Sequence, residues 1–327
     1  MDIESITGNE QAVGEFLYGH LHALAARTSG TVERMDVAPR RFNVLATWGA
    51  PAATLSTHMD TVPPFLASRE DEEFVWGRGA CDAKGIIAAM IAAAERVLSK
   101  GIGNFALLFV VGEEKDSLGA HTAAKAGRGS KYLINGEPTE NQLAIGSKGA
   151  LRCELVARGR LAHSAYPELG DSAIEKLLDV LEEIRRIPLP EDEVLGKATL
   201  NVGTISGGRA PNVVADEARA ELMFRMVDEP KGLREAITKA VRGRIEWREA
   251  LHTPALRMEP ADGLPTTVVS FTTDIPNFQG AWGKPMLIGP GSIHLAHTAE
   301  ERIAKRELRE AVEIYADLVQ KAVASAE

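Results

Sequence analysis

Residues 105–111 read Phe-Ala-Leu-Leu-Phe-Val-Val and run directly into Gly112-Glu113-Glu114. The seven apolar residues are continuous rather than alternating with polar ones, which is typical of a strand covered on both faces, as in a parallel sheet under helices. Two adjacent acids at the end of such a strand point to opposite sides of the chain. One glutamate could therefore bind metal while the other moves protons. The alternative explanation of the same residues is an acidic turn exposed to solvent.

Helix-like and strand-like segments alternate around this strand and predict an α/β domain. The predicted helices span 9–27 and 84–99, and the predicted strands span 43–48, 54–57 and 132–134. Near the C-terminus we expect a helix over 265–274, a strand over 286–288 and a long helix over 299–324. This tail is too short for a domain of its own, so we expect it to complete the first sheet.

The pattern of predicted strands and helices changes at about residue 150. Strands are predicted over 151–157, 200–205, 218–227 and 245–248, and helices over 171–186 and 230–242. The expected fold class is therefore α/β, with a mostly parallel sheet between helices and an inserted α+β unit of four strands and two helices. We expect the catalytic domain at 1–149 and 256–327, and the insertion at 150–255.

The composition indicates a folded protein and excludes several classes. Of 327 residues, 45% are hydrophobic and 25% are charged, with 37 Lys and Arg against 46 Asp and Glu. The net charge of −9 disfavours general attraction to nucleic acid or an anionic membrane. Cys81 and Cys153 are too few for a disulfide framework or a thiolate zinc cluster. The N-terminus does not resemble a signal peptide, so we expect a cytoplasmic protein without nucleic-acid or membrane partners.

Four further polar clusters lie just after predicted strands or just before a predicted helix. They are 57–60 (THMD), 77–85 (GRGACDAKG), 135–139 (NGEPT) and 289–297 (GPGSIHLAH). In the first, His58 and Asp60 are two apart on an extended chain and can face one site, so the carboxylate can orient the imidazole. Taken alone, this tetrapeptide more often marks a strand-end histidine beside a turn aspartate.

The glycine-rich segment 77–85 is a poor phosphate-binding loop. Asp82 replaces the third glycine of G-x-G-x-x-G and no G-K-[ST] follows, so a phosphate would face a carboxylate. An aspartate among small residues can instead approach a cation closely and bridge two ions. Cys81 has no evident histidine base beside it, which favours a packing role over a nucleophilic one.

Together the clusters supply two imidazoles and three carboxylates without a thiolate. Functional residues gather at the carboxyl ends of strands in open α/β sheets, so these side chains should converge. The donor set fits two zinc-like ions about 3.5 to 4 Å apart that share a carboxylate. The expected ligands are His58, Asp82, Glu114, Glu137 and His297.

The ordered motifs THMD, GRGACDAKG, GEE, GEPT and GPGSIHLAH resemble those of the di-zinc amidohydrolases, a family that includes acetylornithine deacetylase, succinyl-diaminopimelate desuccinylase, glutamate carboxypeptidase and aminoacylase. The resemblance spans nearly the whole chain. It implies two Zn²⁺ sites, replaceable by Co²⁺, with these ligands: His58, Asp82 and Glu137 for one, and Asp82, Glu114 and His297 for the other. It also implies that Asp60 stands behind His58, that Glu113 is the general base and that the peptide after Asp82 is cis.

The inserted unit resembles the lid and dimerisation domain of the same family. Segment 159–167 (GRLAHSAYP) resembles the lid motif whose histidine, here His163, reaches the active site of a partner subunit and polarises the scissile carbonyl. The resemblance thus implies a homodimer formed through the lid. Three further residues lie where relatives contact substrate: Lys148, Asn212 and Arg225.

These resemblances imply metal-dependent hydrolysis of the amide bond of an N-acyl amino acid. GEPT and GPGSIHLAH favour an acetylornithine deacetylase-like enzyme of amino-acid biosynthesis, acting on N-acetyl-ornithine, N-acetyl-citrulline or N-acetyl-lysine. The alternatives are a succinyl-diaminopimelate desuccinylase or a dipeptidase or carboxypeptidase of the family and, in another class, a degenerate homologue that binds small molecules. Two features depart from the family: the start at segment 7–10 (TGNE) without the usual leader, and His294 at a position that is polar or acidic in acetylornithine deacetylases.

Overall fold

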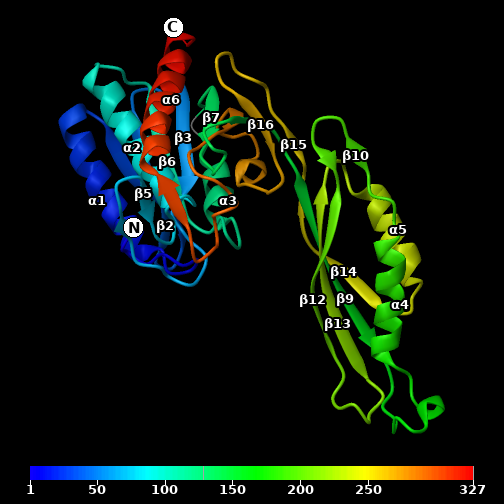
Figure 1. Cartoon of the computed structure of the whole chain (residues 1–327). Coiled ribbons are helices and arrows are strands. Elements are labelled where there is room, and N and C mark those ends of the chain that lie inside the picture. Colours follow the sequence, from blue (N-terminus) through cyan, green and yellow to red (C-terminus); the bar gives the residue numbers. More distant parts are fainter. Residues whose placement is uncertain (128, 327) are drawn as a thin grey trace. The chain divides into compact units, whose positions relative to one another are not determined.

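The computed structural model describes residues 1–127 and 129–326, and the chain divides into two compact units (Figure 1). The first unit comprises Met1–Ile145, Met258–Thr267 and Thr273–Glu327, and the second comprises Gly146–Arg257 and Val268–Thr272. The returning segment joins the second unit because Lys148 N–H donates to the Val269 carbonyl (3.1 Å) and the Ser147 hydroxyl donates to the Phe271 carbonyl (2.6 Å). The sequence predicts the insertion at 150–255, and the second unit has the bounds given above.

The central sheet of the first unit is mixed with a parallel middle. Its strands run in the order β1-β2-β6-β3-β7-β17-β8, and β6, β3, β7 and β17 are parallel neighbours. Strands β3 and β6 are buried at every residue, as the continuous apolar pattern predicts. The strands are β1 (Thr31–Ala38), β2 (Arg41–Trp48), β3 (Ala53–His58), β6 (Phe105–Val110), β7 (Tyr132–Asn135), β8 (Leu143–Ser147) and β17 (Lys284–Leu287).

Helices cover both faces of this sheet, and β6 contributes alternate residues to the two cores. Phe105, Leu107 and Phe109 pack under the first helix layer, whereas Leu108 packs with Trp282 on the other face. The first layer consists of α1 (Gln11–Thr28), α2 (Lys84–Ser99) and α6 (Lys305–Ala324), and the second of α3 (Leu118–Ala124) and the 3-10 turn η2 (Ile275–Phe278). A small separate sheet is formed by β4 (Arg69–Glu70), β5 (Phe74–Trp76) and β18 (Arg302–Ala304).

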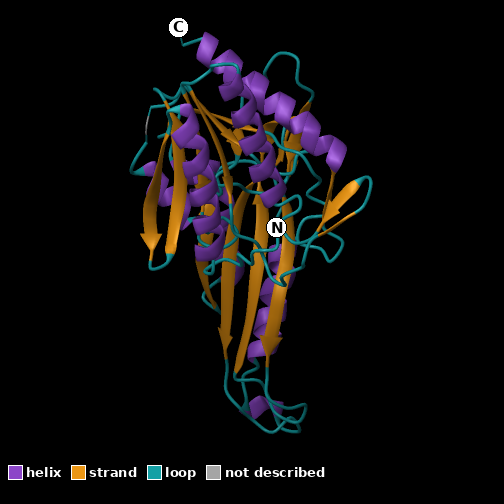
Figure 2. Ribbon diagram, turned by 90° about the vertical axis from the view of Figure 1, so that its left-hand side faces the viewer, coloured by secondary structure: helices purple, strands orange, loops and turns teal. Residues whose placement is uncertain are grey.

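The second unit is an antiparallel sheet with helices on one face, as expected from its sequence (Figure 2). The strand order is β12-β13-β9-β14. The strands are β9 (Gly149–Arg158), β12 (Thr199–Gly207), β13 (Glu217–Met226) and β14 (Glu246–Thr253), and the helices are α4 (Ala173–Arg185) and α5 (Lys231–Val241). Short elements complete it: η1 (Pro167–Leu169), β10 (Glu191–Asp192), β11 (Gly196–Lys197) and β15 (Leu256–Arg257).

Two expectations near the C-terminus are wrong. Residues 265–274 do not form a helix but contain β16 (Thr266–Val269), whose four β-branched residues lose side-chain freedom in a helix and pack well in a sheet. The last helix begins at Lys305 rather than near 299, because residues 302–304 pair with β5. Among the described residues, no helix combines the length and apolarity that a membrane span needs.

Candidate metal centre

The strand ends of the first unit bring the predicted ligands to one edge of its sheet. His58 is the last residue of β3, Glu114 follows β6, and Glu137 follows β7. His297 lies in the loop after β17, and Asp82 lies just before α2. Because β3, β6, β7 and β17 are parallel, their carboxyl ends meet at the same edge, and the five side chains converge there.

Asp82 lies between the two imidazoles. Its Oδ1 is 2.9 Å from His58 Nε2, and its Oδ2 is 3.2 Å from His297 Nε2. His297 Nε2 is also 3.0 Å from Glu114 Oε1. Two groups suited to a cation therefore share Asp82: His58, Asp82 and Glu137, and Asp82, Glu114 and His297. The peptide Asp82–Ala83 is cis.

The chemistry of the two groups fits divalent cations. In each group the ligand atoms lie within 4.8 Å of one another, and nitrogen and oxygen donors of this kind suit zinc or cobalt. Oε1 of Glu137 is buried and has no hydrogen-bond partner among the described residues. A buried polar atom without a partner costs free energy, so a cation at this position would supply the missing interaction.

The pKa values of the cluster change in the direction expected for side chains that share protons. Hydrogen bonds to Asp82 and Glu114 raise the pKa of His297 to about 10. Burial raises the pKa of Glu137 and of Glu114. Burial also opposes the charged form of Asp82, but both imidazoles hold the pKa of that carboxyl below its usual range. A cation would displace the shared protons, so its affinity should fall as the pH is lowered.

Asp60 organises the loop that carries the two glutamates. Its Oδ1 accepts hydrogen bonds from the N–H groups of Gly112 (2.9 Å) and Glu113 (3.2 Å), and its Oδ2 accepts one from Glu114 N–H (3.3 Å). His58 Nδ1 lies 3.0 Å from the Asp60 backbone carbonyl and 3.5 Å from the Asp60 carboxylate. The sequence had linked Asp60 to His58 alone, because its contacts with the distant loop have no local signature.

Glu113 belongs to neither cation-binding group, although it is the neighbour of Glu114. Burial raises its pKa, and the negative charge of Glu137 raises it further. A buried carboxylate beside a metal centre, with its pKa raised in this way, is suited to accept and return a proton. Sequence reasoning missed Asp274, a buried acid whose Oδ2 has no hydrogen-bond partner among the described residues and whose pKa burial raises to about 6. No motif around Asp274 marks it.

The four predicted residues of the second unit form two pairs at opposite ends of its sheet. His163 and Asn212 belong to neighbouring loops at one end, where Ser164 N–H donates to the Asn212 carbonyl (3.0 Å). Lys148 directly precedes β9, and Arg225 faces Ala150 near the other end. Strand β13 has ten residues, so the two pairs are about 30 Å apart.

Each end of this sheet presents a polar group with free hydrogen-bonding capacity. At the first end, Ala165 N–H donates to His163 Nδ1 (3.1 Å), so a neutral His163 ring carries its proton on the exposed Nε2. At the second end, Lys148 donates to the Lys197 carbonyl (2.7 Å). The half-buried Arg225 guanidinium has no hydrogen bond or ion pair to any residue that the structure describes, and burial lowers its pKa.

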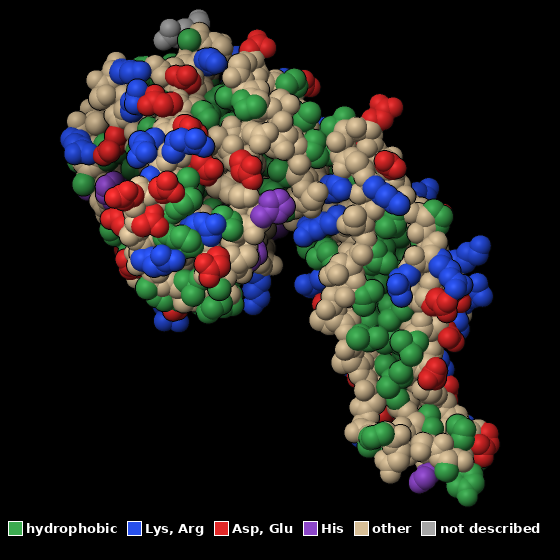
Figure 3. All heavy atoms as spheres, viewed as in Figure 1, with side chains coloured by type: hydrophobic (Ala, Val, Ile, Leu, Met, Phe, Trp, Pro, Cys, Tyr) green, Lys and Arg blue, Asp and Glu red, His purple; other side chains and the backbone are tan. Residues whose placement is uncertain are grey.

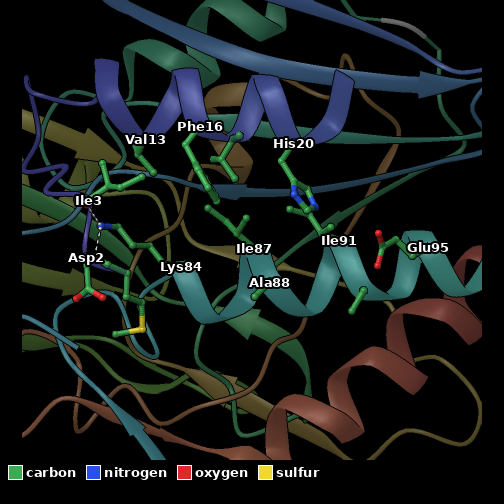
Figure 4. Close-up of a pocket in the computed structure, with 13 residues that line it drawn as sticks. Asp2, Ile3, Val13, Phe16, His20, Lys84, Ile87, Ala88, Ile91 and Glu95 are labelled. Carbon is green, nitrogen blue, oxygen red and sulfur yellow. Dashed lines mark hydrogen bonds between the residues drawn. The ribbon is translucent and has the colours of Figure 1, made fainter. Parts of the chain in front are cut away.

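A separate apolar groove of about 520 Å³ lies between α1 and α2 (Figure 4). Phe16 and His20 of α1 face Ile87 and Ile91 of α2 across it, and Lys84 closes one end by donating to the Ile3 carbonyl (2.6 Å). None of the predicted site residues lines this groove. The groove is therefore separate from the cluster around Asp82.

Known proteins share sequence similarity with this chain over most of its length. The model of Peptidase family M20/M25/M40 matches residues 54–321. A probable carboxypeptidase of Aspergillus niger is 37% identical over 367 residues, which cover 99% of this chain and 88% of that protein.

Solved structures share the fold. A tripeptidase from Staphylococcus aureus has a TM-score of 0.82 at 20% identity, covering 98% of this chain and 95% of that one. A dinuclear metal-binding M20 peptidase from Bacillus subtilis has a TM-score of 0.68 at 15% identity, covering 99% and 94%. With the family model matching most of the sequence, including the motifs from His58 to His297, the chain belongs to the peptidase family M20/M25/M40.

Proposed function

We propose that this protein is a two-zinc exopeptidase that hydrolyses the amide bond beside a free α-carboxylate in dipeptides and other short peptides. The observation that carries the proposal is the shared carboxylate: Asp82 has one oxygen on each imidazole, and Glu113 lies next to the ligand set. The name of the Aspergillus niger relative supports peptides rather than N-acetyl-ornithine as substrates.

The two groups around Asp82 would hold one zinc ion each. Bound zinc supplies a Lewis acid that polarises a carbonyl and lowers the pKa of a water to about 7. The chain must therefore fix its ligands and exclude competing geometries. Asp60 does so for Glu114 by accepting a hydrogen bond from its backbone N–H, and for His58 through the Asp60 backbone carbonyl, which lies 3.0 Å from Nδ1.

Glu113 moves the proton of the reaction. It accepts a proton from the attacking water as the water oxygen bonds to the amide carbon, and it returns that proton to the leaving nitrogen as the C–N bond breaks. Because the pKa of Glu113 is raised by burial, its carboxyl can hold the proton between these two steps. The hydrogen bond from Glu113 N–H to Asp60 orients the loop for this transfer.

His163 donates a hydrogen bond to the carbonyl oxygen while negative charge develops on it. Its Nδ1 already accepts from Ala165 N–H, so the proton on Nε2 is the one available to substrate. A donor already oriented in this way acts most strongly on the tetrahedral state. Arg225 and Lys148 would bind the α-carboxylate, since a guanidinium without a protein partner forms strong charge-assisted bonds to carboxylates.

The separation of His163 from Arg225 favours a homodimer. A dipeptide is much shorter than the 30 Å or so between the two ends of the sheet, so one protomer cannot offer both ends to one substrate. A second copy can supply His163 to the site that uses Arg225 of the first. The distance between the two ends supports the trans arrangement that the sequence resemblance implies.

Strand β12 offers the surface for that dimer. It is an edge strand without charged residues, and it is exposed along almost its whole length, whereas the other edge strand, β14, contains Glu246, Arg248 and Glu249. Charged edges resist pairing with another strand and uncharged edges allow it. An apolar stripe beside β12 and α4 is visible in Figure 3. The groove there is lined by Glu182 and Arg185 and by these apolar residues: Leu178, Leu181, Leu189, Leu200, Val202 and Ile205.

The double substitution Val202→Lys and Ile205→Lys should convert the dimer to a monomer. Two ammonium groups on each β12 edge would repel their copies across a two-fold axis. Sedimentation velocity measures the change, and activity should fall with it because His163 loses its partner site. Leu251→Lys on β14 is the matched control and should remain dimeric. An active dimeric double variant would contradict this interface.

A hydrolysis panel tests the proposed function. We expect turnover of dipeptides and tripeptides that carry a free C-terminal carboxylate and loss of turnover when that carboxylate is amidated. Chelation should abolish activity, and Zn²⁺ or Co²⁺ should restore it. N-acetyl-ornithine, N-acetyl-citrulline, N-acetyl-lysine and N-succinyl-diaminopimelate are the comparison substrates.

Two outcomes of the panel would overturn the proposal. Faster hydrolysis of N-acetyl-ornithine than of any peptide would favour an acetylornithine deacetylase-like activity. A protein that binds no zinc or cobalt, and shows no amidase activity when either is added, would be a degenerate binding homologue.

A further inference from the structure

A fully buried ion pair lies behind the loop that carries Asp82. Glu301 and Arg78 are 1% and 2% exposed, and Glu301 Oε2 is 2.5 Å from Arg78 Nη1. The Arg78 guanidinium also donates to the carbonyls of Pro64 and Thr298, each at 3.2 Å. Neither side chain belongs to the cation-binding groups, and neither takes part in the proposed hydrolysis.

The other oxygen of Glu301 collects backbone N–H groups from the Asp82 loop. Oε1 accepts from Gly79 (2.9 Å), Cys81 (3.3 Å) and Asp82 itself (3.3 Å). The Glu301 carbonyl accepts a further hydrogen bond from Gly77 N–H (3.0 Å). One buried carboxylate therefore holds the backbone of the whole segment that leads to the shared ligand.

The same pair fixes the segment that carries His297. Thr298 directly follows His297, and its carbonyl is held by Arg78. Arg78 belongs to the Asp82 loop, while Glu301 belongs to the His297 segment, so each segment contributes one charge to the pair. The bond between these charges thus joins the two segments whose ligands Asp82 and His297 are 3.2 Å apart, from Oδ2 to Nε2.

We propose that Glu301, paired with Arg78, is the positioning residue that holds the shared ligand Asp82 against His297 and thereby sets the metal affinity of the centre. This inference rests on the metal centre proposed above. Glu301 acts through backbone N–H groups and does not touch substrate. Residues behind a first set of ligands typically change metal affinity by about 10- to 100-fold when they are mutated.

Glu301→Gln is the first test. A glutamine side chain has one accepting oxygen and one donating NH₂ group. If the oxygen faces the loop N–H groups, the NH₂ group faces the Arg78 guanidinium; if the oxygen faces Arg78, the NH₂ group faces the loop N–H groups. Either way, one pair of donors meets without an acceptor. We expect zinc affinity, measured by competition with a chromophoric chelator, to fall by about 10- to 100-fold. The Co²⁺ absorption spectrum should change, and kcat should fall with little change in KM.

A second variant separates positioning from folding. Arg78→Met combined with Glu301→Leu leaves no unpaired buried charge, and replacing a buried ion pair with apolar residues is often tolerated. It still removes the acceptor for the three N–H groups, so zinc affinity should remain low although the protein is folded by circular dichroism. Glu301→Asp keeps the charge and should recover part of the affinity. Leu21→Ala in the α1 core is the matched control, which should lower the melting temperature without lowering zinc affinity.

Two results would overturn the inference. Folded Glu301→Gln or the folded double variant could bind two zinc ions as tightly as the wild type with an unchanged Co²⁺ spectrum, in which case Glu301 is not a positioning residue but the metal centre stands. A wild-type protein that binds no zinc or cobalt would overturn the metal centre and this inference together.

Discussion

Glu113→Gln is expected to lower kcat by about 10²- to 10⁴-fold, the range typical for removal of a general base. Glutamine keeps the size of the side chain but cannot take a proton from water. Glu113 is outside both cation-binding groups, so the variant should still bind two zinc ions, and KM should change little. Steady-state kinetics on the best peptide of the panel, together with metal analysis, measure both properties.

Asp116→Asn is the matched control for this substitution. Asp116 is an acid of the same loop, but its carboxylate pairs with Arg41 and is outside the metal cluster. The Asp116→Asn variant should therefore keep most of the wild-type activity. Equal kcat values for Glu113→Gln and the wild type would show that Glu113 is not the base, and loss of zinc by Glu113→Gln would show that it acts as a ligand instead.

His163→Ala should lower kcat by about 10²- to 10³-fold, as expected for loss of one donor to a developing oxyanion. Mixing it with the Glu113→Gln protein should restore activity if His163 acts on its partner. In the mixed dimer, one site combines an intact Glu113 with an intact His163 and the other has neither. With random exchange, half the dimers are mixed and half of their sites work, so about a quarter of wild-type activity should return.

The control for this complementation is a mixture of Glu113→Gln and Asp82→Asn proteins. Both substitutions affect the same catalytic unit, so no arrangement of these subunits assembles a complete site. Recovery in this control would indicate refolding or contamination rather than complementation. No recovery in the first mixture, with mixed dimers demonstrated by tagged subunits, would place His163 in the site of its own chain.

The strongest sequence signals were those that reflect local physics. The unbroken apolar run 105–111 predicted a strand buried on both faces, and β6 indeed contributes to two cores. Acids and histidines next to such strands were predicted to converge, and the structure brings all five together around Asp82. Strand direction explains this success, because parallel strands end at one edge.

The weakest signals were those in which pairing partners compete with local preference. Segment 265–274 was predicted as a helix, but the β-branched run in β16 forms a strand. The last helix was predicted to begin near residue 299. In the structure residues 302–304 pair with β5 instead, and the helix begins at Lys305. The conformation of a short segment depends on which strands can form hydrogen bonds with it. Those strands are distant in the sequence, so the local residues do not reveal them.

The sequence by itself determined the fold class, the family motifs and the identity of the side chains available to bind cations, because these depend on residue type, periodicity and order along the chain. Only the tertiary structure decided how those side chains are held. Asp60 accepts from N–H groups more than fifty residues away, and Glu301 from a loop more than two hundred residues away. It also decided that His163 and Arg225 occupy opposite ends of one sheet. These are long-range hydrogen bonds and distances, and they exist only after the strands have paired.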